Sequence, residues 1–395
     1  MKAVTIPKAG KPEVLEIRNY PDPRPRSREV SIKVAAAGVN FADIQARMGL
    51  YPDAPGPPLV VGYEVAGEIL EVGGIDRTQM QEAESNDTAD GKSAAGDVTG
   101  KSAARDVSGK TAGSGESAPN DASAKASNRF SPGDRVLALT RFNGYSETVV
   151  VPQDQVFPVP DNLSLAEAAA IPVNYLTAWQ LTEMGGLKNG DTLLIHNAGG
   201  GVGLAALDLA RRRGARTIGT ASAGKHERLI ERGLDIAIDY RTENWVERVL
   251  EHTNGKGADL IFDPIGGSNW KKSIRALRPT GRLGMYGVSE VTRSFFPGSL
   301  KFLSVLGRMP FYTPVQLMNQ NKGVYGVNIG RLWNEKQKVM QWALAILEGA
   351  KEGWIRPHVD AVFTFEQAAE AHRYIEERRN FGKVLLTPGK LSDSG

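Results

Sequence analysis

The sequence predicts an α/β protein with two domains, one rich in β-strands and one built on a doubly wound parallel sheet. Three observations predict this fold class. The chain has 395 residues, more than a single hydrophobic core usually serves. Short strand-like runs separated by Pro and Gly turns fill about the first 70 residues. From Ser164 onward strand and helix patterns alternate, which is typical of βαβ units in a parallel sheet with helices on both faces.

The N-terminal part predicts a β-rich domain at residues 1–158. Runs rich in valine and isoleucine predict strands at Val14 to Ile17, Glu29 to Ala35, Tyr63 to Val72 and Arg135 to Leu139. The last 40 residues again predict short strands. Two short strands, Ala361 to Phe365 and Lys383 to Thr387, flank a helix from Phe365 to Arg378. We therefore expect residues 353–395 to pack back on the N-terminal domain.

The middle of the chain, residues 159–352, predicts the parallel-sheet domain. Its expected helices are Leu165 to Ile171, Tyr175 to Met184, the glycine turn to Arg213, Lys225 to Arg232, Asn244 to His252 and Asn269 to Leu277. Its expected strands are Thr192 to His196, Arg216 to Ala221, Ile236 to Tyr240, Asp259 to Asp263, Arg282 to Gly287 and a final strand Gly323 to Ile329.

Residues 76–128 have a different composition, dominated by Ser, Ala, Gly, Asp and Lys, with repeats at a period of nine. Such a segment buries too little apolar surface to offset its ordering entropy, so we predict a disordered insertion in a surface loop. Its GKS and GKT triplets lack the first glycine and the preceding strand of a P-loop. We therefore assign them no phosphate-binding role.

Composition excludes several classes of function. The chain has no cysteine, which rules out disulfides, thiolate catalysis and thiolate metal sites. None of the five histidines forms an HExxH motif or an i,i+4 pair, so we predict no metal site. A net charge of +3 is too small to indicate nucleic-acid binding. No apolar run reaches the roughly 18 residues that cross a bilayer, and no secretory signal is recognisable, so we expect a cytoplasmic protein.

A glycine-rich turn, Ala198 to Gly203, lies between an apolar strand and a helix inside a βαβ repeat, the context of a dinucleotide-binding fingerprint. The three fingerprint positions are occupied by Ala198, Gly200 and Gly203. Gly200 would let the backbone approach a pyrophosphate, and Gly203 would let helix and strand pack closely. The free amides of Gly201 and Val202 would face the phosphates at the positive end of the helix.

The residues after the next two strands favour NADP over NAD. NAD sites usually carry a carboxylate about 20 residues beyond the turn, whereas here the strand ends in Ser222 without one. Ser222, Lys225 and Tyr240 offer a hydroxyl, an ammonium and a phenol to an extra 2′-phosphate. Lys225 lies at a helix start, where a cation is unfavourable unless an anion binds there. The alternative for Lys225 is a solvated surface residue.

Several segments together resemble the medium-chain dehydrogenase/reductase superfamily, in its zinc-free quinone oxidoreductase branch and closest to the VAT-1-like subgroup. The segments that carry the resemblance are Gly38 to Asp43, Arg47 to Tyr51, Val173 to Ala178, Gly219 to Glu227 and Asp263 to Ser268. The resemblance covers nearly the whole chain except the insertion. It implies a GroES-like β-rich catalytic domain and a Rossmann domain.

The departures from the zinc-dependent members are informative. Those members bind zinc through a cysteine and a histidine where this sequence has Asn40 and Tyr63. The resemblance therefore implies metal-free hydride transfer to an electron-poor acceptor, whose developing negative charge needs stabilising. It places Asn40 and Tyr51 near the nicotinamide as catalytic hydrogen-bond donors. Ordinary loop packing for Tyr51 and a strand-end hydrogen bond for Asn40 are the alternatives.

The resemblance also completes the expected cofactor cleft. The further cofactor-binding residues that it implies are Thr177, Gly266, Tyr286, Val288, Asn380 and Lys383.

Three functions are open at this point. The first is an NADPH:quinone reductase without zinc, and the second is a reductase of enals or enoyl thioesters with the same fold and cofactor. The third is a VAT-1-type protein that binds NADPH and works mainly through partners, which the charged repeats favour. The final strand Gly323 to Ile329 is expected to lie at a sheet edge. In relatives that edge pairs across a dimer, so the resemblance implies a homodimer, which would also cover an edge prone to aggregation.

Overall fold

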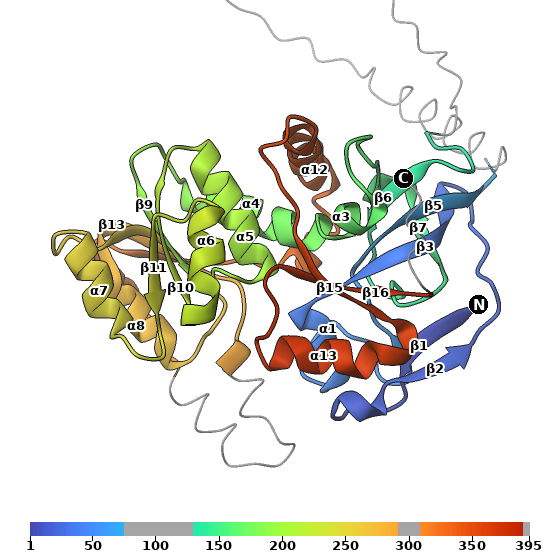
Figure 1. Ribbon diagram of the computed structural model, residues 1–395, viewed down its shortest axis with the longest axis horizontal. Coiled ribbons are helices and arrows are strands. Elements are labelled where there is room, and N and C mark those ends of the chain that lie inside the picture. The colour runs from blue at the N-terminus through green and yellow to red at the C-terminus, as the bar shows by residue number, and fades with distance from the viewer. Residues whose placement is uncertain (75–128, 291–308, 390–395) are drawn as a thin grey trace, which may run out of the picture.

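The computed structural model describes residues 1–74, 129–290 and 309–389. It forms two lobes, one around strands β1 to β8 with β15 and β16, and one around strands β9 to β14 (Figure 1). The predicted two-domain α/β fold class is confirmed. The predicted disordered insertion at 76–128 lies outside the described residues, and the domain boundaries at 158/159 and 352/353 stay predictions. Among the described residues, no helix is both long and apolar enough to cross a membrane.

The first lobe is a sheet of seven strands with a smaller sheet beside it. The large sheet has the order β15 (Val359–Thr364), β16 (Lys383–Thr387), β3 (Glu29–Val39), β5 (Glu64–Val72), β6 (Arg135–Leu139) and β8 (Val156–Pro158), and β7 (Thr148–Pro152) also pairs with β3. The small sheet has the order β2 (Glu16–Asn19), β1 (Lys2–Ile6) and β4 (Leu59–Val60). Valine and isoleucine side chains from both sheets form one buried core.

The last part of the chain packs on the N-terminal sheet, as predicted. Strand β16 runs antiparallel to β3, with Val384 opposite Val39, and parallel to β15. Three short helices complete this lobe, namely α1 (Phe41–Arg47), α3 (Leu165–Ala169) and α13 (Ala368–Glu376). Helix α3 begins at a capping box, in which the Ser164 hydroxyl accepts a hydrogen bond from the amide of Glu167 and the Glu167 carboxylate accepts one from the amide of Ser164.

The second lobe is a parallel sheet of six strands. Its order is β11 (Ile236–Asp239), β10 (Arg216–Ala221), β9 (Thr192–His196), β12 (Ala258–Asp263), β13 (Leu277–Met285) and β14 (Gly323–Gly326). The chain moves from β9 towards β11 and then returns to β12 on the other side of β9. Ligands of doubly wound sheets bind at this switch point, outside the carboxyl ends of the strands.

Helices cover both faces of this sheet because side chains of a strand alternate between faces. Leu193 and Ile195 of β9 pack in the core formed with α4 (Pro172–Gly185), α5 (Gly201–Arg212) and α12 (Lys336–Lys351). Leu194 packs in the opposite core with α7 (Trp245–His252) and α8 (Ser268–Ala276). Helix α6 (His226–Glu231) joins β10 to β11, and α11 (Pro314–Gln320) precedes β14.

Several predicted elements differ from the structure. The predicted strand Val14 to Ile17 is wrong at its start, because Pro12–Val14 forms a 3-10 turn before β2. The predicted strand Arg282 to Gly287 is displaced, since β13 begins at Leu277, and the predicted edge strand ends at Gly326 rather than at Ile329. Phe365 begins a 3-10 turn before α13. Strands β1, β4, β7 and β8 and helices α1, α11 and α12 had no counterpart in the prediction.

Asp208 of α5 joins several elements of the second lobe. Its carboxylate is fully buried and accepts hydrogen bonds from the Tyr175 hydroxyl of α4 at 2.7 Å, from Arg232 Nη2 at 3.0 Å and from the backbone amide of Arg356 at 3.0 Å. Buried charges persist only when they are paired and hydrogen-bonded in this way. The carboxylate therefore fixes α4, the end of α6 and the chain after α12 against α5.

Replacing Asp208 with alanine should lower the free energy of unfolding by about 3 to 5 kcal/mol, because it leaves the Arg232 guanidinium without its counter-charge and the buried Tyr175 phenol without an acceptor. Urea denaturation followed by circular dichroism measures the change. Asp161→Ala is the matched control, since Asp161 is exposed and its loss should cost less than about 0.5 kcal/mol. Similar midpoints for the two variants would contradict this role of Asp208.

Candidate functional site

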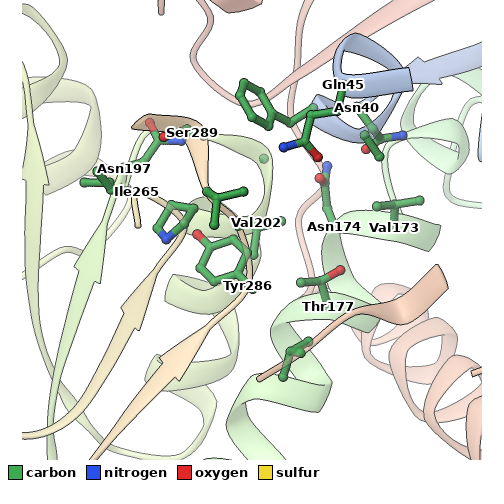
Figure 2. Close-up of a pocket in the computed structure, with 18 of the residues that line it drawn as sticks. Asn40, Gln45, Val173, Asn174, Thr177, Asn197, Val202, Ile265, Tyr286 and Ser289 are labelled. Atoms are coloured by element: carbon green, nitrogen blue, oxygen red, sulfur yellow. The ribbon is translucent and has the colours of Figure 1, made fainter. Parts of the chain in front are cut away.

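A cavity of about 1210 Å³ lies between the two lobes, beside the carboxyl ends of the strands around the switch point. In Figure 2, Asn40 and Gln45 of the first lobe face Ile265 and Tyr286 of the second across this space, and Thr177 of α4 lies below Asn174 on the side of Asn40. The cavity is therefore in the place where a doubly wound sheet binds its ligand.

Most of the predicted site residues line this one cavity. Those that do are Asn40, Tyr51, Thr177, Gly200, Gly201, Val202, Ser222, Lys225, Tyr240, Tyr286, Val288, Asn380 and Lys383. The remaining three, Ala198, Gly203 and Gly266, lie behind the lining and shape the backbone. Gly266, for example, has a φ of +83°, and a Cβ there would lie 3.1 Å from Val288 Cα.

The glycine turn forms a cradle that side chains would fill. Helix α5 begins at Gly201, so its first amides have no partner within the helix. A Cβ at Gly201 would lie 2.5 Å from the Asn174 side chain, and one at Gly203 would lie 2.5 Å from the carbonyl oxygens of Asn197 and Ala198. The turn can therefore pack this closely only with glycine, and its shape and donors fit a pyrophosphate.

A cluster of cations and a phenol, the cation corner, lies where the C-terminal segment meets the second lobe. We define it as Lys225, Tyr240, Arg241 and Arg378. Lys225 Nζ donates hydrogen bonds to the carbonyl oxygens of Arg378 and Asn380, at 2.9 and 2.5 Å. Arg378 Nη1 donates to the Tyr240 hydroxyl at 3.1 Å, and the Arg241 guanidinium lies 5.9 Å from the Tyr240 ring centroid.

Local electrostatics shift two pKa values in this corner. Burial lowers the pKa of the Lys225 ammonium. Burial raises the pKa of the Tyr240 phenol, but hydrogen bonds from Arg378 and Arg241 and their charges outweigh it, so this pKa is lowered overall. A concentration of positive charge that lowers a phenol pKa is an environment that favours a phosphate group. The sequence analysis did not find Arg378, which comes from the far end of the chain.

A buried polar network lies where the first lobe meets α4. The Glu64 carboxylate pairs with Lys383 Nζ, and it accepts hydrogen bonds from Asn40 Nδ2 at 2.8 Å and from the backbone amide of Val173 at 2.7 Å. Lys383 Nζ also donates to Asn40 Oδ1 at 2.7 Å. Glu64 and Lys383 are 0% and 2% exposed. Glu64, which the sequence analysis did not assign to the site, is the centre of the network.

The side chain of Asn40 is engaged inside the protein. Its Nδ2 donates to Glu64 and, at 3.3 Å, to the carbonyl oxygen of Gly38, and its Oδ1 accepts from Lys383. Its backbone amide donates to Asp43 at 2.8 Å. These are hydrogen bonds of the strand-end kind that was the alternative to a catalytic role, and the catalytic role of Asn40 stays a prediction.

Asp43 holds the loop that carries Asn40. Besides Asn40, it accepts hydrogen bonds from the amide of Gly62 at 2.9 Å and from the Tyr145 hydroxyl at 3.1 Å. Complete burial raises the pKa of Asp43 to about 7, although the two amides oppose the shift. The carboxylate of Asp43 therefore holds the backbone at Asn40 and Gly62 in place next to the cavity.

Tyr51 and Tyr63 lie side by side in the wall of the cavity, with their rings edge to face and the centroids 5.6 Å apart. Burial raises the pKa of Tyr51, and an interaction with the Asn328 side chain opposes this shift. Tyr63, considered in the sequence only as a residue in a metal-ligand position, thus contributes an aromatic surface to the cavity.

The described residues contain no group of three or more His, Asp or Glu side chains that could hold a metal ion. At the positions where zinc-dependent relatives carry ligands, Asn40 is hydrogen-bonded within the protein and Tyr63 offers a phenol. The neighbouring Glu64 is committed to Lys383. This donor set does not fit zinc, which prefers imidazole and thiolate with carboxylate.

Lys383→Met should lower the free energy of unfolding by about 3 to 5 kcal/mol, because it leaves the Glu64 carboxylate buried without its cation. The double variant Lys383→Met/Glu64→Gln should recover much of this loss, since it removes both charges. Urea denaturation of the wild type, both single variants and the double variant gives the coupling energy. Strictly additive losses would show that the two side chains are not coupled.

Comparison with known proteins finds relatives over nearly the whole chain. Residues 26–161 match a family model described as alcohol dehydrogenase GroES-like domain, and residues 232–386 match one described as zinc-binding dehydrogenase. The human synaptic vesicle membrane protein VAT-1 homolog is 33% identical over 381 residues, 95% of this chain and 83% of the relative. A quinone oxidoreductase of Pseudomonas aeruginosa is 30% identical over 390 residues, 98% of this chain and 99% of the relative.

Solved structures agree with these matches. A mycobacterial protein whose structure was solved with NADPH superposes with a TM-score of 0.75 at 26% identity, over 98% of this chain and 100% of the other. The likeness therefore extends over both lobes.

Proposed function

Since the chain belongs to the medium-chain dehydrogenase/reductase superfamily, in the branch of the VAT-1-like proteins and quinone oxidoreductases, we propose that it is a zinc-independent reductase that uses NADPH to reduce a quinone or a similar electron-poor carbonyl compound. The observation that carries this proposal is the single cavity that joins the glycine turn, the cation corner and an aromatic wall. The relative named quinone oxidoreductase and the neighbour solved with NADPH support it.

Different residues would bind different parts of the cofactor. The amides of Gly201 and Val202 would bind the pyrophosphate at the positive end of α5. Ser222 and the cation corner would bind the 2′-phosphate through charge-assisted hydrogen bonds. When bound, NADPH supplies a hydride to the acceptor.

The rest of the cavity suits an acceptor with a flat, conjugated ring. Its lining contains several aromatic side chains, namely Phe41, Tyr51, Tyr63, Trp270, Tyr286, Tyr312 and Trp333. Aromatic walls pack well on planar rings, and closing water out of such a site strengthens the hydrogen bonds that stabilise developing negative charge. No side chain of the cavity is assigned as a proton donor, because solvent can protonate a reduced quinone.

The proposal is tested by following NADPH oxidation at 340 nm with a panel of acceptors, namely 1,2- and 1,4-quinones, an enal and crotonyl-CoA. We expect turnover with the quinones. Turnover confined to crotonyl-CoA or the enal would replace the quinone assignment with the second candidate function. Tight NADPH binding without turnover of any acceptor would favour the third candidate, a protein that works through partners.

Lys225→Ala should weaken NADPH binding by about 10- to 100-fold, the range expected for losing a hydrogen bond to a charged group. NADH lacks the 2′-phosphate, so its affinity should change much less. Fluorescence titration measures the affinities of the variant for NADPH and for NADH. A loss confined to NADPH indicates a lost phosphate contact, because a loosened C-terminal segment would weaken the binding of both nucleotides equally. Lys272→Ala, an exposed lysine of α8, is the control and should change neither affinity.

We further propose that the protein is a homodimer. Strand β14 ends the six-stranded sheet among the described residues, and an open sheet edge favours pairing with another chain. Three exposed apolar side chains, Phe311, Val315 and Met318, lie just before this strand. The cytoplasmic location stays a prediction.

A further inference from the structure

The hydroxyl of Tyr63 is buried without a hydrogen-bond partner among the described residues. Tyr63 is 7% exposed and lines the cavity, just before strand β5. A buried polar atom left unpaired costs about 1 to 3 kcal/mol, and such atoms are uncommon in native proteins. An unpaired hydroxyl in the wall of a binding cavity therefore points to a ligand group that completes it.

Two other polar side chains of the cavity lining, those of Tyr51 and Asn40, interact with other residues of the protein. The Asn328 side chain interacts with Tyr51 and opposes the rise of its pKa. The Asn40 amide is engaged by Glu64, Gly38 and Lys383. The Tyr63 hydroxyl thus lies beside polar groups that are engaged within the protein, and among the described residues it makes no hydrogen bond of normal geometry.

The surroundings of Tyr63 keep its hydroxyl a donor. Burial raises its pKa, and the charge of Asp43 and the Tyr51 phenol raise it further. The Tyr63 ring is held between two other rings, edge to face with Tyr51 at 5.6 Å and tilted at 55° to Phe142 at 5.4 Å. A phenol held in this way is neutral at neutral pH and stays a hydrogen-bond donor.

Building on the reductase function proposed above, we propose that Tyr63 is a catalytic residue whose hydroxyl donates a hydrogen bond to the carbonyl oxygen of the acceptor. The acceptor gains one hydride, a hydrogen with two electrons, as NADPH is oxidised to NADP⁺, and the resulting anion takes one proton from solvent. Tyr63 keeps its own proton and stabilises the anion. A neutral phenol thus occupies the position in which zinc-dependent relatives carry a metal ligand.

Tyr63→Phe tests this role, because phenylalanine keeps the ring and removes only the hydroxyl. We expect kcat/KM for a 1,4-quinone to fall by about 10- to 100-fold, somewhat less than the loss of a full oxyanion-hole donor. The affinity for NADPH should not change. The thermal midpoint should be unchanged or higher, because the folded protein loses no hydrogen bond and no longer buries an unpaired hydroxyl.

Tyr374→Phe is the matched control. The Tyr374 hydroxyl donates to Asp360 at 2.9 Å and does not line the cavity, so its removal should lower the thermal midpoint and leave kcat/KM unchanged. The two variants should therefore show opposite patterns. A Tyr63→Phe protein with wild-type kcat/KM for the quinones would overturn the role of Tyr63 while leaving the reductase function intact.

A binding measurement decides the case in which the wild type reduces no acceptor. Menadione is titrated onto the NADP⁺ complex, in which no hydride can be transferred, and tryptophan fluorescence reports its dissociation constant. If Tyr63 donates a hydrogen bond to the carbonyl, the dissociation constant of menadione should be about 2- to 10-fold higher in Tyr63→Phe than in the wild type. Equal constants, or no binding of menadione to the wild type, would overturn the inference.

Discussion

The Glu64 carboxylate is the group on which the relation between the two lobes depends. It belongs to β5 of the first lobe, and it accepts hydrogen bonds from the start of α4 in the second lobe and from Asn40 at the start of α1. Its counter-charge, Lys383, begins β16. A carboxylate that is fully buried persists only with such complete pairing, so the positions of four elements are fixed by one group. The cavity exists where these elements meet.

The close packing of this network also explains why position 38 is a glycine. A Cβ at Gly38 would lie 2.3 Å from Glu64 Oε1 and 2.5 Å from Lys383 Cε. No larger residue fits there without displacing the ion pair. The Gly38 to Asp43 segment, which carried much of the family resemblance, is thus constrained first by packing around a buried charge and second by its place beside the ligand.

The elements predicted with correct bounds are those whose signal is local. The strands at Thr192–His196, Arg216–Ala221 and Lys383–Thr387 combine β-branched or leucine-rich runs with flanking turns, and the glycine turn was recognisable because a strand precedes it and a helix follows. Strand β2 was misplaced since all its side chains are exposed and it has no apolar alternation. Helix α12 carries a helical spacing of buried residues, such as Ile346 and Ala350, that the prediction did not use.

The site was predictable where motif and geometry coincide. Thr177, Ser222 and Tyr286 line the cavity as the resemblance implied. Arg378, Glu64 and the unpaired hydroxyl of Tyr63 could not be found in the same way. Arg378 reaches Tyr240 from 138 residues further along the chain, and whether a hydroxyl is unpaired depends on every neighbour in space. Such properties follow from tertiary packing rather than from any local pattern.

The path of the C-terminal segment sets the order in which the protein can mature during synthesis. The amide of Gly382 donates to the carbonyl oxygen of Gly199 in the glycine turn at 2.9 Å, and β16 is inserted between β15 and β3 rather than added at an edge. Residues up to β16 must therefore be synthesised before the nucleotide pocket can close. Until then strand β3 is an open edge of the N-terminal sheet, and the docking of β15 and β16 covers that edge.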